Sequence, residues 1–133
     1  ATASAQQTRF AVQTVVYDCF AQQKLDAVVY PSGNIPAGVL TAPPEPTVND
    51  RGLNWTTISG RGFAALTVPA GFTTVVYDRG ASGELLPPAP ARLPVGLDVL
   101  GLPFSEAKLF EIAAAYEAAT RHRAPPPGFG PVN

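Results

Sequence analysis

The sequence GRGFAALTVPAGF occupies residues 60–72. Its centre, residues 65–68, is small, apolar and partly β-branched, a composition typical of a buried strand. The glycines before this centre indicate a close backbone approach or a positive φ. Pro69 and Gly71 follow it and predict the end of regular strand pairing. We therefore expect a short strand in the interior of a sheet, and a second one at residues 28–29, Val-Val, which have the same character.

The composition is that of a folded protein. Of the 133 residues, 46% are hydrophobic and 14% are charged, which excludes a chain kept disordered by charge. The formal net charge is −1, so the chain has no surplus of Lys and Arg for binding nucleic acid. No apolar run approaches the ~18 residues of a membrane span. We therefore expect residues 1–133 to form a single domain or a fragment of one, with neither nucleic acid nor a membrane span.

The start of the chain carries little information about targeting. The chain contains no Met, and its first residues lack the basic and apolar parts of a signal peptide. This composition fits a chain that begins inside a longer protein, although a processed terminus would look the same. A single cysteine and the lack of a signal favour the cytoplasm.

One cysteine and one histidine are present. Cys19 lies among apolar residues, and we expect it to be buried in the core rather than to act as a reactive thiol. His122 lies between two arginines at the expected end of a helix, with no second histidine or cysteine pair to complete a zinc site. Neither residue has a neighbour in the sequence that would orient or activate it for catalysis. The sequence therefore predicts no metal and no cofactor.

Helical and extended segments follow one another along the chain. Residues 6–24 and a segment from Ser105 to about 121–123 have helical periodicity, and Ser105 is the expected N-cap. Strands are predicted at 25–30, 65–68, 73–78 and 93–100, and long loops at 33–53 and 79–92. The faces expected to be buried carry Phe10, Val12, Val16, Cys19 and Phe20 on the first helix and Leu109, Ile112, Ala113, Tyr116 and Ala119 on the second. This order predicts an α/β fold, a portion of a mixed β-sheet covered by helices.

Several linked blocks of sequence resemble the C-terminal part of the amidase-signature family. SGRGFAALTVPAGF at 59–72 resembles the family's SGxPAxTVPAGF, and LPVGLDVLG at 93–101 resembles LPVGLQxxG. PFSE at 103–106 opens a helix that matches PFxExxLxxxAxAxE, and DAVVYPS at 26–32 resembles the DxLxxPT strand. The resemblance covers nearly all of this chain but only a minor, C-terminal share of a typical member. The chain departs from the common pattern at Ala64, at Asp98, where a glutamine is frequent, and in its longer loop at 79–92.

The resemblance implies an enzyme that hydrolyses amide bonds through a serine nucleophile, which a lysine activates through a bridging serine in a cis peptide. In the family, a glycine- and serine-rich run carries the nucleophile and the oxyanion donors. That run is missing here, and the two lysines of the chain, Lys24 and Lys108, have no serine cluster nearby. We therefore predict that this chain contains none of the Ser-Ser-Lys catalytic residues and is inactive alone.

The resemblance also implies which residues line the mouth of the substrate pocket in a complete enzyme. By position these are Asn34, Ile35, Asn54, Trp55, Thr57 and Ile58. The apolar members could instead pack in the core or between subunits, and the asparagines could be turn residues. Arg61 could bind a substrate carboxylate through its forked guanidinium, or could form a surface ion pair.

Two functions remain open from the sequence. In the first, the chain is the C-terminal portion of an amidase, whose partners are the N-terminal remainder of that amidase and a small-molecule amide. In the second, it is a non-catalytic binding or assembly module that uses residues 33–53 to hold a partner. The first predicts an unpaired edge at strand 65–68 or its neighbour, so that the isolated chain self-associates or needs the missing part.

Overall fold

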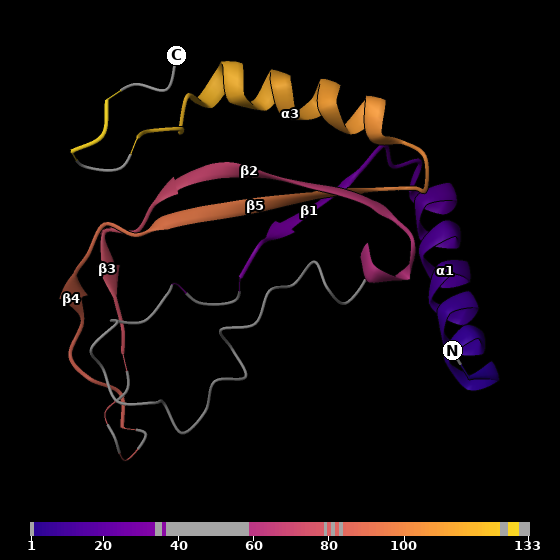
Figure 1. Cartoon of the computed structure of the whole chain (residues 1–133), viewed down its shortest axis with the longest axis horizontal. Coiled ribbons are helices and arrows are strands. Elements are labelled where there is room, and N and C mark those ends of the chain that lie inside the picture. Colours follow the sequence, from indigo (N-terminus) through magenta and orange to yellow (C-terminus); the bar gives the residue numbers. More distant parts are fainter. Residues whose placement is uncertain are drawn as a thin grey trace.

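The computed structural model of the protein describes residues 2–33, 36, 59–78, 80, 82, 84–125 and 128–130. The elements are α1 (Ala3–Gln23), β1 (Val28–Pro31), the 3-10 helix η2 (Ser59–Arg61), β2 (Ala64–Phe72), β3 (Val75–Val76), β4 (Ala89–Pro90), β5 (Pro94–Gly101) and α3 (Glu106–Thr120). α3 lies along one face of the sheet, α1 extends away from one end of it, and β3 and β4 extend from the other end (Figure 1). The expected α/β class is confirmed, but the described sheet is antiparallel throughout, whereas a mixed sheet was predicted.

The sheet is built around β5. It has three strands in the order β1–β5–β2, and β5 pairs with both neighbours in the antiparallel sense. The register between β2 and β5 shifts between Pro69 and Gly71, which is a β-bulge. Gly71 has φ +110°, a conformation that favours glycine. Our prediction that pairing ends at Pro69 is therefore wrong, because the bulge absorbs the irregularity and β2 continues to Phe72.

The prediction of interior strands is also wrong among the described residues. β1 and β2 lie at the two edges of the sheet, and β5 lies between them. Along β1, half-buried and exposed residues alternate, and Val29 is 57% exposed. An apolar run thus does not distinguish a strand that is paired on both sides from one that is paired on one side. Among the described residues, the outer edge of β2 has no paired strand.

The core lies between α3 and the sheet. It consists of Ala64, Val68, Val99, Leu109 and Ala113. A Cβ atom added at Gly101 would come within 2.8 Å of Leu109 Cδ2, so the missing side chain lets α3 approach β5 closely. The expected inward face of α3 is confirmed at Leu109, Ala113, Ile112 and Tyr116, whereas Ala119 is exposed.

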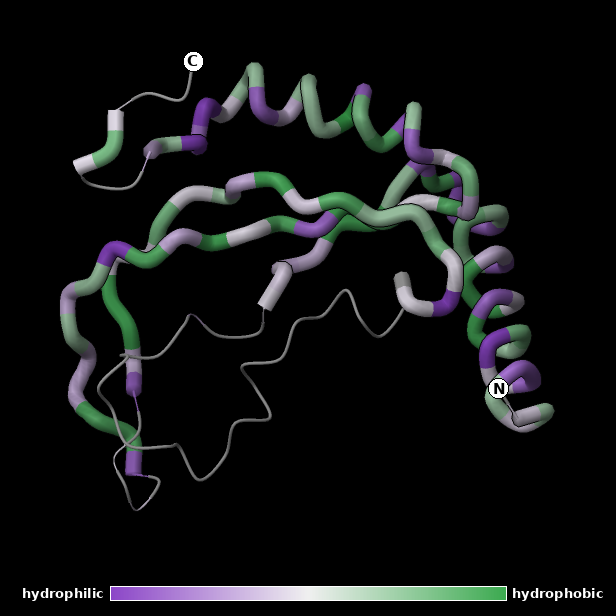
Figure 2. The backbone as a smooth tube through the Cα atoms, viewed as in Figure 1, coloured by the Kyte–Doolittle hydropathy of each residue, from purple (hydrophilic) through white to green (hydrophobic). Residues whose placement is uncertain are grey.

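α1 is confirmed as a helix, but most of its predicted buried face is exposed. Among its described residues only Phe20 is buried, while Phe10 is 63% exposed and Cys19 is exposed. The reason is position: α1 contacts η2 and lies beyond the end of the sheet (Figure 1), so no described layer covers its length. Hydrophobic and hydrophilic positions alternate along this uncovered helix (Figure 2). The prediction of a buried Cys19 is thus wrong.

Three elements differ locally from their predicted bounds or caps, each for a simple reason. Pro31 belongs to β1 instead of stopping it, because an edge strand tolerates a residue without an N–H. Ala89 and Pro90, inside the predicted loop 79–92, form β4 and pair with β3. Ser105 makes no side-chain cap on α3, because its hydroxyl donates to the Leu102 carbonyl at 2.6 Å.

Among the described residues no helix is long and apolar enough to cross a membrane.

Candidate functional site

Most of the predicted substrate-binding residues cannot be placed. Asn34, Ile35, Asn54, Trp55, Thr57 and Ile58 lie outside the described residues. Arg61 ends η2, and its backbone carbonyl accepts hydrogen bonds from Arg9 Nε at 3.1 Å and Gln13 Nε2 at 2.7 Å. These two bonds attach η2 to α1. No described carboxylate forms an ion pair with the Arg61 side chain, and its role in binding substrate stays a prediction.

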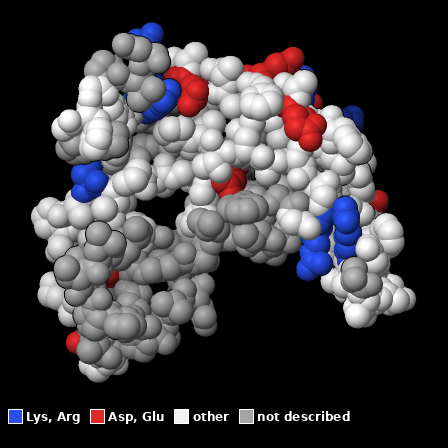
Figure 3. Space-filling model, viewed as in Figure 1, with Lys and Arg blue, Asp and Glu red and all other residues white. Residues whose placement is uncertain are grey.

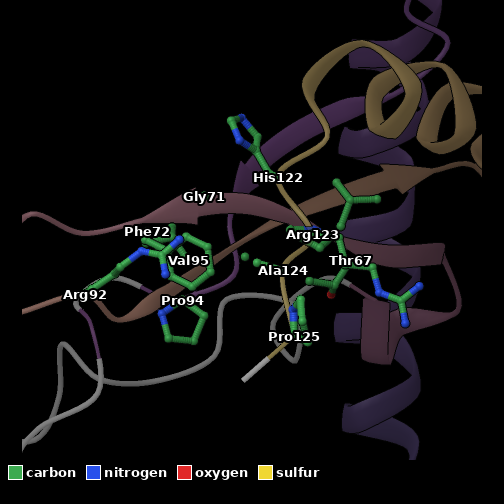
Figure 4. Close-up of a pocket in the computed structure, with 13 residues that line it drawn as sticks. Thr67, Gly71, Phe72, Arg92, Pro94, Val95, His122, Arg123, Ala124 and Pro125 are labelled. Carbon is green, nitrogen blue, oxygen red and sulfur yellow. The ribbon is translucent and has the colours of Figure 1, made fainter. Parts of the chain in front are cut away.

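A cavity of about 690 Å³ lies at the other end of β2, between the sheet and the segment that follows α3 (Figure 4). This volume is within the range of sites that bind small molecules. The cavity is lined by Thr67, Val68, Pro69, Gly71, Phe72, Arg92, Pro94, Val95, Gly96, His122, Arg123, Ala124 and Pro125. Three segments that are distant in sequence therefore build one pocket: the end of β2, the start of β5 and residues 122–125.

Backbone geometry at two residues brings these segments together. Arg121 follows α3 with φ 52° and ψ 36°, and its N–H donates to the Glu117 carbonyl, which turns the chain off the helix axis. His122 then lies near the bulge, since a Cβ atom added at Gly71 would be 3.7 Å from His122 Nδ1. The ring of Tyr116 lies 6.2 Å from that of His122. The left-handed turn at Arg121 and the glycine bulge in β2 thus bring His122 and Gly71 together at the cavity.

The described ionisable side chains that line the cavity are all basic in type. The guanidinium carbon of Arg92 lies 3.9 Å from the centroid of the Phe72 ring, a cation–π contact. Arg92, His122 and Arg123 line the cavity, and no described Asp or Glu does. Figure 3 shows basic side chains at the end of α3 and near the start of β5. The cavity therefore combines an apolar wall with donors for an anion.

A second polar feature lies within the sheet. Asp98 is 1% exposed, and its Oδ1 accepts hydrogen bonds from Thr67 Oγ1 at 2.7 Å and from Ser32 Oγ. Asp98 Oδ2 and the Tyr30 hydroxyl are buried and have no hydrogen-bond partner among the described residues. Burial, and then the charge of Asp98, raise the pKa of Tyr30 above its usual value. We call these four residues, Tyr30, Ser32, Thr67 and Asp98, the polar row. Within it, Asp98 Oδ2 is a buried acceptor that no described donor uses.

Strand register explains the row. Tyr30 on β1 and Thr67 on β2 both pair with Asp98 on β5, so the three side chains lie on one face of the sheet. Val99, next along β5, belongs to the core beneath α3, so Asp98 points to the opposite face. The described residues contain no group of three or more His, Cys, Asp or Glu side chains that could hold a metal ion. The row's chemistry is that of hydroxyl donors around one carboxylate.

Sequence reasoning identified part of these features. It noted Asp98 as a departure from the family pattern, but the partners of Asp98 come from strands far apart in sequence, 66 residues away for Ser32. It gave Arg92 and Arg123 no role in binding. Only the run of basic residues at 121–123, just before the prolines at 125–127, could have marked that end of the chain as an anion site.

Comparisons with known proteins point to amidases. No family model matches the chain. The chain is 34% identical over 110 residues to a glutamyl-tRNA(Gln) amidotransferase subunit of Myxococcus xanthus, a match that covers 80% of this chain and 19% of that protein. It is also similar to a crystal structure of the peptide amidase PAM in complex with the competitive inhibitor chymostatin, with a TM-score of 0.60 and 28% identity. That match covers 94% of this chain and 22% of the peptide amidase.

The chain therefore spans about a fifth of the length of each relative it matches. Sequence and fold agree on the relationship. The strands β2 and β5 and the helix α3 are the elements formed by the three blocks of sequence that resemble the family. From these matches, the chain is similar in sequence and in fold to the C-terminal part of an amidase-signature amidase.

Proposed function

We propose that this chain is the C-terminal portion of an amidase that hydrolyses carbon–nitrogen amide bonds. The observation that carries the proposal is the fold match, which takes in 94% of this chain but 22% of the peptide amidase. In this role β1, β5, β2 and α3 supply core, and the segments around 34–35 and 54–61 supply part of the substrate pocket. The Ser-Ser-Lys residues that cleave the amide of a small-molecule substrate come from the N-terminal remainder of the amidase.

Exposed apolar side chains support a partner for this chain. Phe10 and Val15 on α1 and Phe110 on α3 are large, apolar and mostly exposed. β2 also has an unpaired edge among the described residues. Burial of apolar surface stabilises an assembly by roughly 25 cal/mol per Å², so these positions favour contact with the amidase remainder or, without it, self-association. The single free cysteine supports a cytoplasmic location.

An activity assay on two lengths of protein tests the proposal. The native-length protein from its source cells and the chain of residues 1–133 are incubated with a panel of small primary and secondary amides, and the release of ammonia or amine is measured. We expect turnover by the native-length protein and none by residues 1–133. Cys19→Ala in the native-length protein is the control, and we expect it to leave turnover unchanged. Turnover by residues 1–133 alone, or none by the native-length protein, would contradict the proposal.

One observation is equally compatible with an alternative, a non-catalytic binding or assembly module with an amidase-derived fold. The sequence has no glycine- and serine-rich run to carry a nucleophile. In this alternative, residues 33–53 hold a partner. The same assay separates the two, because the module hydrolyses no amide at its native length.

A further inference from the structure

We propose that the cavity between β2, β5 and residues 122–125 binds a small molecule with an apolar body and one carboxylate. This inference goes beyond the proposed function. The cavity lies at the Phe72 end of β2, whereas Arg61, which is predicted to bind substrate, lies at the Ala64 end.

The walls of the cavity suit the apolar body. Val68 and Phe72 come from β2, Pro94 and Val95 come from β5, and Pro125 lines the cavity from the segment after α3 (Figure 4). Prolines and paired strands lose little conformational freedom when a ligand binds, so this wall is largely preformed. The volume of about 690 Å³ accommodates a ligand of small-molecule size.

The basic groups suit the carboxylate. Arg92 and Arg123 line the cavity, and among the described residues neither has an ion pair or a hydrogen bond to occupy its guanidinium. Arg92 stacks on Phe72 by its face. Because all guanidinium donors lie in the plane of the group, stacking leaves them available for the two oxygens of a carboxylate. With no acidic residue in the described lining, an anion is favoured over a neutral or cationic head group.

Binding of a matched pair of probes tests the proposal. Decanoate and undecan-2-one have nearly the same shape, but the ketone carries a methyl group where the acid carries a charged oxygen. Each is titrated calorimetrically into the native-length protein. We expect decanoate to bind about tenfold more tightly or better, the effect of a hydrogen bond to a charged group. Arg92→Gln should reduce this preference.

Two further variants control for charge and for the site. Arg121→Gln removes the same charge from an exposed residue beside the cavity that does not line it, and the preference for decanoate should persist. Ala124→Trp places a large ring in the cavity from an exposed position, and both probes should bind at least tenfold more weakly.

The proposal is overturned by equal binding of the two probes, by no binding of decanoate, or by an Arg121→Gln effect equal to that of Arg92→Gln. Absence of binding because another segment fills the cavity in the native-length protein counts among these results. The outcome is independent of the amide assay. Suppose that the native-length protein binds decanoate in a way that depends on Arg92 but hydrolyses no amide. This result would support the present inference and contradict the proposed function.

Discussion

Thr67 on β2 donates a hydrogen bond of 2.7 Å to Asp98 on β5, its direct partner in strand register. Tyr30 opposes Asp98 from the other side, on β1, and Ser32 just beyond β1 donates to the same carboxylate oxygen. One buried carboxylate thus connects all three strands of the sheet. Since a slip of one residue would turn Asp98 to the face covered by α3, this contact helps to fix the register.

The Thr67–Asp98 bond predicts a cost for Thr67→Val. The substitution keeps the shape of the side chain but removes the donor, and we expect the free energy of unfolding to fall by roughly 1 to 2 kcal/mol. Urea denaturation measures this change. Thr74→Val is the matched control, since Thr74 is exposed and its side chain makes no hydrogen bond among the described residues. Equal effects of the two substitutions would show that the bond does not stabilise the sheet.

Gly96 lies beneath the same cluster. A Cβ atom there would come within 2.6 Å of Ser32 Oγ, so Gly96→Ala should push Ser32 away from Asp98 and destabilise the protein by about 1 to 3 kcal/mol. Combined with Ser32→Ala, which removes the clashing hydroxyl, Gly96→Ala should cost measurably less than it does alone. A double-mutant cycle by urea denaturation tests this coupling. Strict additivity of the two effects would contradict the close contact.

Tyr30 predicts a dependence of stability on alkaline pH. Its pKa is raised above 10.0, because burial and the charge of Asp98 both disfavour the tyrosinate. The stability contributed by the neutral form is therefore complete below pH 10 and is lost as the pH rises through the folded-state pKa. Tyr30→Phe should remove this loss and raise stability at pH 7 by about 1 kcal/mol, because it deletes a buried hydroxyl without a partner among the described residues.

Denaturation between pH 7 and pH 11 measures both effects of Tyr30→Phe. Tyr77→Phe is the control, because Tyr77 is 57% exposed, and it should keep the alkaline loss of the unmodified protein. A loss that persists in Tyr30→Phe would assign it to another group.

Two neighbouring residues on α3, Leu109 and Phe110, differ in burial and should therefore differ in their contribution to stability. Leu109 is 1% exposed and packs on β5 at Gly101, so Leu109→Ala should lower the free energy of unfolding by about 2 to 5 kcal/mol. Phe110 is 66% exposed, and Phe110→Ala in residues 1–133 should change the free energy of unfolding by less than about 0.5 kcal/mol. Comparable losses would contradict the assignment of the inward face of α3.

The elements that could be predicted from sequence are those with a local signal. α1 and α3 have long stretches without Gly or Pro, and β5 is a mostly apolar run that begins with proline, so the predicted bounds of all three are nearly correct. The relation to amidases came from short motifs in β1, β2, β5 and α3. β4 carried no such signal, since Ala89 and Pro90 are extended only through pairing with β3.

The remaining features depend on distant contacts. Cys19 is exposed because α1 lies beyond the end of the sheet. Helical periodicity predicts which face of a helix is apolar, but not whether another element covers that face. The order β1–β5–β2 places a run as apolar as 65–68 at an edge, and composition alone does not show which side is paired. The cavity requires residues 67–72, 92–96 and 122–125 to meet, so only the three-dimensional structure shows that Arg92 and Arg123 line one cavity.

The mass of the native protein in its source cells tests the central claim most directly. An antibody raised to residues 1–133 is used to probe a cell extract under denaturing conditions. If the chain is the C-terminal portion of an amidase, the band should be several times heavier than the 13.8 kDa of these residues. A band at 13.8 kDa would contradict that claim and favour the non-catalytic module.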